Sequence, residues 1–452
     1  MGNTVFVGYA RGDMTPKEPV PLAGYGNTLT RIHQGVLDPL MATCVAISDE
    51  QDRTVLLFTL DIVATREEVF LKTRQRISRK YGIPVEAVIM SATHTHSAPD
   101  FAQKEHPGMV RYGQKLADLL EETAGKALAD RQPAEMRCGT TCNSGMNYVR
   151  HYIQENGAVC GDNYGDHTAS PYKCHVSEAD RELRIVRFIR ETGKDVLIVN
   201  WQAHPNLAST IATEYGRAHR PLVSADYVGA CRDYVEEHED VHFAFFQGAA
   251  GNLNSRSRLE WEVDTRDHRL YGQQLGAIVL EGLGSLRPLT GGKVTAAAET
   301  LHGRANHSED HLAEEARKIR AVWQETNDPQ LCMQMGKDCG IHSAYHAGAI
   351  LGKLELPSHV DMTLGAAGIG QLGVAALPYE VFDTNGKYIR EKSPYPMTLI
   401  FSSANGGFNY IPSAQGFAHG CYEADMCKHA PGTGEEAAEL MVQMLAQLHT
   451  EE

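Results

Sequence analysis

The feature that most constrains this chain is an apolar strand that ends in a pair of histidines. The run Ala87-Val88-Ile89-Met90 predicts a buried strand, and His94 and His96 follow it within residues 91–99. Residues two apart in an extended chain point the same way, so the two imidazoles share one face. Two imidazoles at a rigid strand end suit a metal site or an acid/base site, although two histidines bonded within an ordinary loop would give the same pattern.

Charge narrows the kinds of partner that this chain can have. Its 452 residues carry 42 Lys and Arg against 57 Asp and Glu, which gives a formal net charge of −15. This surplus argues against nucleic acid and against electrostatic docking on anionic lipid. A hydrophobic content of 42% is ordinary for a globular α/β enzyme, and we expect a small-molecule substrate as the partner.

The first residues and the cysteines bear on cellular location. No basic segment followed by an apolar core begins the sequence, and no run of eighteen apolar residues occurs, so we expect neither a signal peptide nor a transmembrane span. We therefore expect a cytoplasmic protein whose ten cysteines are mostly reduced thiols. The spacings Cys138-x3-Cys142 and Cys421-x5-Cys427 do not match a strong structural-zinc pattern.

Strands and helices alternate along the first part of the chain. The strands Met41–Ser48 and Val55–Val63 precede a helix that begins at Thr65. Thr65 and Glu68 match a capping box at its start, and Gly82 is suited to end it. The strand that carries the histidine pair comes next, and this strand–helix–strand order predicts a parallel crossover.

The rest of the chain continues the mixture of elements. A hairpin is predicted over residues 183–203, and later helices are predicted over 226–238, 269–285, 308–325 and from residue 434 to the end. These elements predict an α/β fold with mixed β-sheets flanked by helices. We expect a single domain over residues 1–452, with a candidate subdomain seam near residue 290, where Thr290-Gly291-Gly292 forms a turn.

Polar residues recur at predicted strand ends that are far apart in the sequence. His204 follows the apolar strand Val196–Ala203, Glu380 follows Leu377-Pro378-Tyr379, and Tyr410 follows a glycine- and asparagine-rich turn. The sequence does not by itself bring these residues to the histidine pair. If they met, two imidazoles, a carboxylate and a further oxygen would suit Zn²⁺, whose bound water attacks carbonyl carbons.

The order of several motifs is similar to that of the neutral/alkaline ceramidases, a family of zinc amidases that cleave the N-acyl bond of ceramide. The motifs in residues 5–254 are Gly-Asp-Met-Thr-Pro, Leu-Ala-Gly-Tyr-Gly, Gly-Val-Leu-Asp-Pro-Leu, Ser-Ala-Thr-His-Thr-His-Ser-Ala-Pro, Gln-Ala-His-Pro, Ser-Ala-Asp-Tyr and Gln-Gly-Ala-Ala-Gly-Asn. Beyond residue 255 the resemblance rests on Leu-Pro-Tyr-Glu and Asn-Gly-Gly-Phe-Asn-Tyr-Ile. It implies a ceramidase-like catalytic domain that uses zinc to hydrolyse an amide.

The resemblance also implies metal ligands and catalytic residues at specific positions. The implied zinc ligands are His94, His204, Glu380 and Tyr410. The implied catalytic residues are His96, Arg150 and Tyr410. Because both histidines of a His-x-His pair can bind one metal, the residues themselves leave open whether His96 is a ligand or a proton carrier.

The chain departs from the family pattern at points that bear on substrate and mechanism. Tyr379 stands where the family has a glycine before the ligand glutamate, and Asn254 stands where the family has a serine, so a serine nucleophile is not expected. Family ceramidases are typically secreted or surface proteins with an added C-terminal immunoglobulin-like domain. We expect a short cytosolic form that acts on a ceramide-like or smaller N-acyl substrate.

Other functions and other roles fit the same residues. One alternative is a zinc hydrolase that acts on a different small polar substrate, such as a cyclic amide, an ester or a glycoside. Another is a zinc-binding relative without catalysis. Asp13, Asp38 and Asp61 are candidates for orienting the imidazoles, and ordinary hydrogen bonds within loops would equally account for them.

Overall fold

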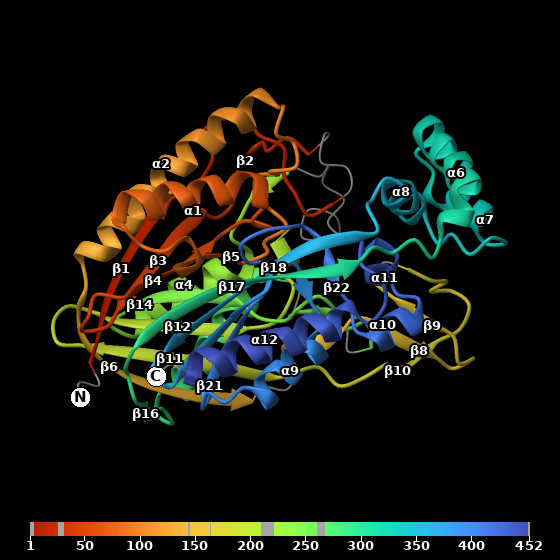
Figure 1. Cartoon of the computed structure of the whole chain (residues 1–452). Helices are drawn as coiled ribbons and strands as arrows, with labels where there is room; N and C mark the ends of the chain where they lie inside the picture. Colours follow the sequence, from red (N-terminus) through yellow and green to blue (C-terminus); the bar gives the residue numbers. More distant parts are fainter. Residues whose placement is uncertain are drawn as a thin grey trace.

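A computed structural model describes residues 4–25, 31–142, 145–162, 164–208, 221–259 and 267–450 of the chain. Gly26, the last residue of the Leu-Ala-Gly-Tyr-Gly motif, lies outside these residues. The described chain forms four layers, namely helices, a nine-stranded sheet, a four-stranded sheet and further helices (Figure 1). This arrangement confirms the predicted α/β fold with mixed sheets flanked by helices.

The larger sheet, as far as the chain is described, contains nine strands in both parallel and antiparallel pairs. Its hydrogen-bonded order is β14 (Val241–Gln247), β12 (Asp195–Trp201), β11 (Glu182–Arg190), β6 (Gln132–Cys142), β1 (Val5–Asp13), β3 (Met41–Ser48), β4 (Thr54–Leu60) and β5 (Val88–Ala92), with β16 (Arg287–Leu289) beside β6. β4 and β5 pair in parallel across α1 (Glu67–Tyr81), which confirms the predicted crossover. β11 and β12 form the predicted antiparallel hairpin.

The second sheet packs face to face with the first. Its order is β17 (Val294–Arg304), β18 (His359–Ile369), β19 (Leu372–Ala376) and β21 (Met397–Phe401). Alternation along β3 illustrates the packing, since Ile47 joins the core between the sheets while Ala46 joins the core under the helices. Phe246 and Phe401 stack with their ring centroids 4.0 Å apart, so the two sheets interlock through β14 and β21.

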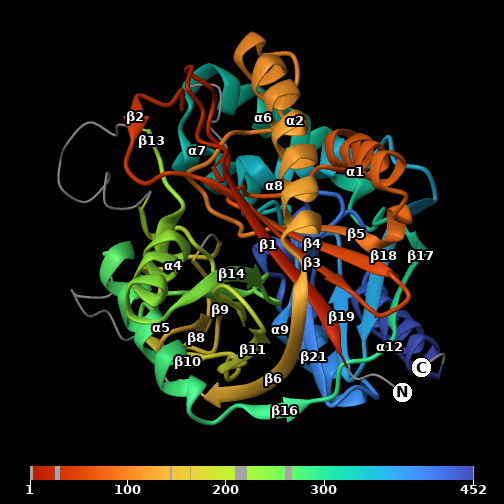
Figure 2. The same cartoon turned by 90° about the vertical axis from the view of Figure 1, so that its left-hand side faces the viewer.

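Helices cover both outer faces of the paired sheets. α1 and α2 (Pro107–Ala129) cover one half of the larger sheet, and α4 (Asp226–His238) and α5 (His268–Leu283) cover the other half (Figure 2). α9 (Asp383–Lys392) and α12 (Thr433–Thr450) cover the four-stranded sheet. None of the helices in the described ranges is both long and apolar enough to cross a lipid bilayer.

Helix α1 ends as predicted but begins differently. Gly82 adopts a left-handed φ of 68° and caps the last turn. The helix begins at Glu67 with Arg66 as its N-cap. The predicted capping box is wrong because the Thr65 hydroxyl donates to the backbone carbonyl of Ser403 at 3.0 Å. This bond ties the start of α1 to the loop that follows β21.

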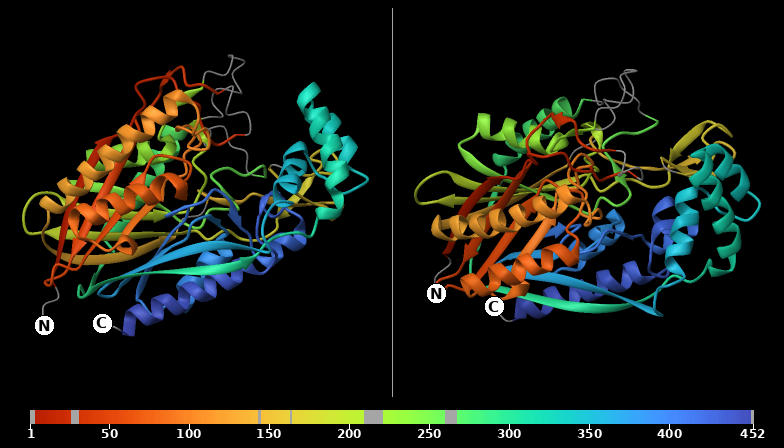
Figure 3. Two further views of the ribbon diagram at one scale, coloured as in Figure 1. Left: turned by 45° about the horizontal axis from the view of Figure 1, so that its top comes forward. Right: turned by 90° about the horizontal axis from the view of Figure 1, so that it is seen from above.

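Between β17 and β18 the chain forms a group of helices, residues 309–353, which we term the helical insertion. α6 (Ala313–Thr326), α7 (Pro329–Gly336) and α8 (Ala344–Lys353) pack around a small core of their own. Figure 3 shows these helices standing at one side of the layered body. The turn at residues 290–292 lies between β16 and β17, where the chain passes from one large sheet to the other.

We predict that Phe401→Ala lowers the free energy of unfolding by about 3–5 kcal/mol, because it removes a buried ring and leaves a cavity between the sheets. Urea unfolding followed by circular dichroism measures the change. Tyr388→Ala, on the exposed side of α9, is the control and should change the value by no more than about 0.5 kcal/mol. Equal effects of the two substitutions would contradict the proposed packing of the sheets.

Candidate metal centre

His94 and His204 follow two strands of the larger sheet, and a backbone carbonyl orients each ring. β5 ends at Ala92, and the chain then turns at His94, whose φ of 72° is left-handed. His94 Nδ1 lies 2.6 Å from the Val63 carbonyl oxygen, and His204 Nδ1 lies 2.9 Å from the Leu253 carbonyl oxygen. Because a carbonyl only accepts, each Nδ1 carries a proton, and in the neutral ring Nε2 then presents a lone pair.

Glu380 and Tyr410 reach the same place from the C-terminal half of the chain. They are register partners in the parallel pair β20 (Glu380–Val381) and β22 (Tyr410–Ile411). The Glu380 N–H also donates to the Asn409 carbonyl at 2.9 Å. The carboxylate and the phenol therefore start from neighbouring backbone positions, and both side chains are buried.

Three of the four predicted ligand residues, His94, His204 and Glu380, converge on one point together with His96. Glu380 Oε2 lies 3.2 Å from His94 Nε2 and 3.1 Å from His204 Nε2. His96 Nε2 lies 3.4 Å from His94 Nε2, and one ring nitrogen from each of the three histidines lies within 4.8 Å of the others. The structure thus brings together three imidazoles and a carboxylate that are separated by up to 286 residues in the sequence.

Burial keeps two of the three clustered imidazoles uncharged. Burial lowers the pKa of His204 to about 4, and the Arg150 guanidinium acts in the same direction. Burial also lowers the pKa of His96 well below its ordinary value. At neutral pH His96 and His204 are therefore neutral and supply no positive charge to the neighbouring Glu380 carboxylate.

A divalent cation fits this arrangement better than hydrogen bonds do. Neither carboxylate oxygen of buried Glu380 accepts a hydrogen bond from any described residue. Oε2 instead lies 3.1 Å from His204 Nε2 and 3.2 Å from His94 Nε2, where a neutral ring presents a lone pair, and acceptors at such separations repel one another. Two imidazoles and a carboxylate are a ligand set that Zn²⁺ takes in catalytic sites. The residues present therefore fit a metal of this type.

Arg150 and Tyr410 lie against the same cluster. Arg150 Nη1 lies 3.2 Å from His204 Nε2, and Arg150 Nη2 donates to Tyr410 Oη at 3.4 Å. Burial lowers the pKa of Arg150, but Glu423 and Tyr410 outweigh it and raise that pKa well above its ordinary value. Burial raises the pKa of the Tyr410 phenol, which is therefore protonated. A permanent cation and a phenolic donor thus border the ligand atoms.

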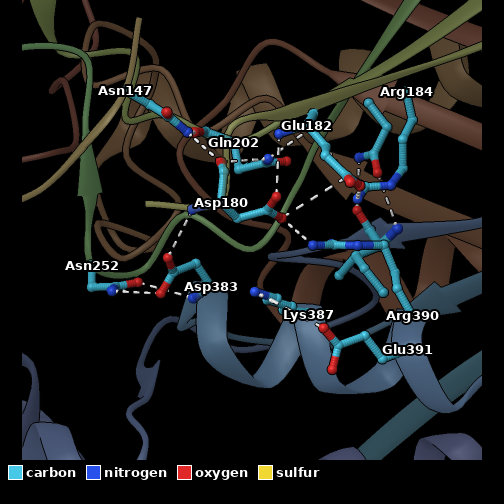
Figure 4. A network of polar contacts seen from close by, with 12 residues as sticks. Asn147, Asp180, Glu182, Arg184, Gln202, Asn252, Asp383, Lys387, Arg390 and Glu391 are labelled. Carbon is cyan, nitrogen blue, oxygen red and sulfur yellow. Dashed lines mark hydrogen bonds and ion pairs between the residues drawn. The ribbon is translucent and has the colours of Figure 1, made fainter. Parts of the chain in front are cut away.

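A buried polar network holds the segments that carry these residues (Figure 4). Asn252 Nδ2 donates to Asp383 Oδ1 at 2.8 Å, and the Asp383 N–H donates to Asn252 Oδ1 at 3.0 Å. The Asn252 carbonyl accepts the Arg150 N–H at 2.9 Å, and the next residue, Leu253, orients the second histidine. Asp383 begins α9, directly after β20. The Asn252–Asp383 pair therefore couples three site segments.

Asp180 extends this network toward the end of β12. Its backbone carbonyl accepts from Asn147 Nδ2 at 2.7 Å and from Gln202 Nε2 at 2.9 Å (Figure 4). Its N–H donates to Asp383 Oδ2 at 3.1 Å, and its carboxylate pairs with Arg390. Since Gln202 lies two residues before the second histidine, the network fixes the path of the chain into the metal centre.

The aspartates proposed to orient the imidazoles have other partners. Within the described residues, the partners are Arg232 for Asp61, His268 for Asp38 and Lys17 for Asp13. The alternative interpretation, ordinary structural bonds, is therefore correct for all three. Backbone carbonyls orient the rings instead, and sequence reasoning could not find them because every residue has a carbonyl.

Sequence reasoning also missed an acidic residue that holds the arginine. Glu423 Oε1 accepts from Arg150 Nε at 2.6 Å, and Glu423 Oε2 lies 2.9 Å from His151 Nε2. Tyr422, its neighbour, lies with its ring centroid 5.9 Å from that of Tyr410. The only signal in the sequence was an acidic residue inside a segment bounded by two cysteines, which is too common a pattern to indicate a site.

We predict that the metal-free protein loses stability as the pH falls from about 6.5 to about 4. The pKa of His204 is lowered to about 4, so in this window the unfolded chain binds a proton that the folded protein does not. The free energy of unfolding should therefore fall with falling pH, and His204→Asn should flatten the dependence. Urea unfolding at intervals across this window measures both slopes, and identical slopes would contradict the lowered pKa.

Comparison with known proteins gives relatives in sequence. No family model matches the chain. Two proteins of Arabidopsis thaliana are similar to it, neutral ceramidase 1 at 25% identity over 243 residues and neutral ceramidase 2 at 24% identity over 263 residues. The matches cover 51% and 56% of this chain but 29% and 31% of the relatives, so the aligned part spans about a third of their length.

Solved structures are similar over nearly the whole chain. The crystal structure of neutral ceramidase from Pseudomonas aeruginosa gives a TM-score of 0.71 at 19% identity, covering 99% of this chain and 75% of that one. A structure of a ceramidase complexed with C2 gives the same TM-score and coverage at 16% identity. At these identities the structures establish the fold alone. The chain is thus similar in sequence to neutral ceramidases and has the neutral ceramidase fold.

Proposed function

We propose that this chain is a zinc-dependent amidohydrolase that cleaves an N-acyl amide bond in a ceramide-like or smaller substrate. The observation that carries the proposal is the buried Glu380 carboxylate, which faces two imidazole lone pairs and accepts no hydrogen bond from the described residues. The similarity to neutral ceramidases supports an amide as the bond that is cleaved.

The ligand atoms would hold the ion in an open site. His94, His204 and Glu380 would bind it, and Tyr410 is the proposed fourth ligand because it neighbours Glu380 in the β20–β22 pair. A zinc ion bound there would supply an activated water and would polarise the scissile carbonyl. A structural zinc site is more often closed by cysteines, and this donor set contains none.

His96 and Arg150 would handle protons and charge. The neutral His96 ring faces the cluster through Nε2, and its Nδ1 is buried without a partner among the described residues. It would accept a proton from the attacking water at Nε2 and pass it to the departing amine. The fixed Arg150 guanidinium would stabilise the negative charge that develops on the carbonyl oxygen.

The surroundings of His96 support a substrate with an apolar part. The Tyr25 ring lies 5.3 Å from the His96 ring and is 39% exposed, so an aromatic side chain borders the proposed proton carrier. Asn254 has no hydroxyl and donates its amide to Asp162, which supports attack by water rather than by a side-chain nucleophile. An acyl chain that lies on Tyr25 would bring its carbonyl to the metal centre.

One observation favours a smaller and more polar substrate as the second candidate. The Arg31 guanidinium lies 4.6 Å from the centre of the Tyr25 ring and donates to the His96 carbonyl at 3.2 Å. Burial lowers the pKa of Arg31, yet the group remains a cation at neutral pH. A charge held next to the aromatic face would suit a polar group on a cyclic amide, an ester or a glycoside.

We predict that His94→Ala abolishes both bound zinc and amide hydrolysis, with a rate loss of at least about a hundredfold. Removing the imidazole deletes one of the nitrogen ligands, so the ion should no longer bind. Elemental analysis of dialysed protein gives the zinc content, and release of hexanoic acid from N-hexanoyl sphingosine gives the rate. His302→Ala removes an exposed imidazole on β17 and should change neither quantity. A His94→Ala protein that keeps zinc and activity would disprove the assignment.

We predict that the zinc-loaded wild type releases hexanoic acid from N-hexanoyl sphingosine and from N-hexanoyl para-nitroanilide, and that a chelator stops both reactions until zinc is restored. The para-nitrophenyl ester of hexanoic acid, a cyclic amide and an aryl glycoside complete the panel. Cleavage confined to these three would support the second candidate. Tight zinc binding without hydrolysis of any compound would support a non-catalytic relative and would refute the proposed activity.

A further inference from the structure

A short helix, α11 (Tyr422–Met426), lies between β22, which carries Tyr410, and helix α8 of the helical insertion (Figure 1). Its two acidic residues have different partners, since Glu423 binds residues of the centre and Asp425 binds residues of the insertion. We propose that Glu423 is a positioning residue that aims the Arg150 guanidinium at the reacting carbonyl, and that the insertion fixes this aim by holding α11 through Asp425. The inference rests on the proposed function, which it deepens.

On the inner side, Glu423 determines where the guanidinium lies. Arg150 Nε donates to Glu423 Oε1 at 2.6 Å, and Arg150 Nη2 lies 2.5 Å from the same oxygen. Two contacts along one edge of a planar guanidinium fix its orientation as well as its position. The opposite edge is thereby turned toward the centre, where Nη1 lies 3.2 Å from His204 Nε2.

The carboxylate is itself prevented from rotating. Its second oxygen, Glu423 Oε2, lies 2.9 Å from His151 Nε2. All three side chains are buried, with no more than 4% of each exposed, so water does not compete for these bonds. Because a long arginine side chain has many rotamers, a partner of this kind is what holds its charge at one point in a reaction.

On the outer side, the helical insertion binds α11 at two places. Asp425 Oδ2 lies 2.7 Å from His342 Nδ1, just before α8. Lys353, at the end of α8, donates to the Asp425 backbone carbonyl at 3.1 Å and to Glu309 Oε2 at 2.8 Å. Lys353 is buried, so its charge is committed to these two acceptors. The insertion therefore binds both the side chain and the backbone carbonyl of Asp425 in α11.

A purely stabilising role is a weaker explanation of the Arg150–Glu423 pair. Desolvation of two charges offsets most of their attraction, so buried ion pairs contribute little net stability compared with apolar side chains. This pair also lies where its geometry matters, because the guanidinium reaches both His204 and Tyr410. A misplacement of about 1 Å at such a group commonly costs about a hundredfold in rate.

The test is a double-mutant cycle on the zinc-loaded full chain with N-hexanoyl para-nitroanilide. Glu423→Gln should lower kcat by about tenfold to a hundredfold with little change in KM and with zinc retained. Asp425→Asn should lower kcat severalfold in the same way. In an Arg150→Gln background neither substitution should lower kcat further, because each acts through the arginine. Independent, multiplicative losses would overturn the proposal.

A matched control separates position from charge and stability. Glu236→Gln, on helix α4, removes the carboxylate of a second arginine pair, Arg11–Glu236 at 2.6 Å, which is partly buried. It should leave kcat unchanged whatever it does to thermal stability. If Glu423→Gln fails to fold, Asp425→Asn replaces it as the second substitution in the cycle with Arg150→Gln, because it perturbs α11 from the side of the insertion. A fall in kcat with Glu236→Gln equal to that with Asp425→Asn would also overturn the proposal.

A structural measurement decides the inference without any turnover. A crystal structure of metal-free Glu423→Gln, or of Asp425→Asn, should show the Arg150 guanidinium displaced from Tyr410 Oη and from His204 Nε2, with the histidines and Glu380 in place. An unmoved guanidinium would overturn the positioning role. If the wild type hydrolyses no amide, the proposed function fails, and this comparison still tests whether Glu423 and the insertion set the position of Arg150.

Discussion

The whole centre depends on one electrostatic constraint, a buried carboxylate held against imidazole lone pairs. Glu380 Oε2 lies 3.1 Å from His204 Nε2 and 3.2 Å from His94 Nε2, and the Nδ1 atom of each ring faces a backbone carbonyl on the other side. Acceptors do not gather in a protein interior without something positive between them or a scaffold that forces them together. Here the scaffold brings them together, and a divalent cation among them would turn the repulsion into attraction.

The rigidity comes from the layered sheets and from the polar network at their ends. His94 and His204 follow β5 and β12 of the larger sheet. Glu380 and Tyr410 lie in the strand pair β20–β22, beside the smaller sheet. The stacked rings of Phe246 and Phe401 hold the two sheets together. The hydrogen bonds between Asn252 and Asp383 connect the loops that carry the site residues. The Arg150 guanidinium places a positive charge beside the centre. Its partner, Glu423, lies on α11, next to the helical insertion. A site assembled from so many segments requires a large and tightly packed fold.

Most of the fold could be predicted because its signals are local. Apolar runs placed β3 and the crossover from β4 to β5, and the glycine at position 82 marked the end of α1. The predicted capping box is wrong because the Thr65 hydroxyl donates to the backbone carbonyl of Ser403, which is distant in sequence. The predicted role of the aspartates is wrong because backbone carbonyls orient the imidazole rings. The cytoplasmic location and the roles of the six site residues stay predictions.

The sequence by itself determined which side chains could form a metal centre and the order in which strands and helices would carry them, since periodicity and motif order are properties of neighbouring residues. Only the tertiary structure decided that Glu380 faces His94 and His204, that carbonyls orient both rings and that Glu423 holds Arg150. Those contacts join residues tens to hundreds of positions apart. They exist because two apolar sheets must bury each other's faces, and that packing brings the strand ends together wherever they lie along the chain.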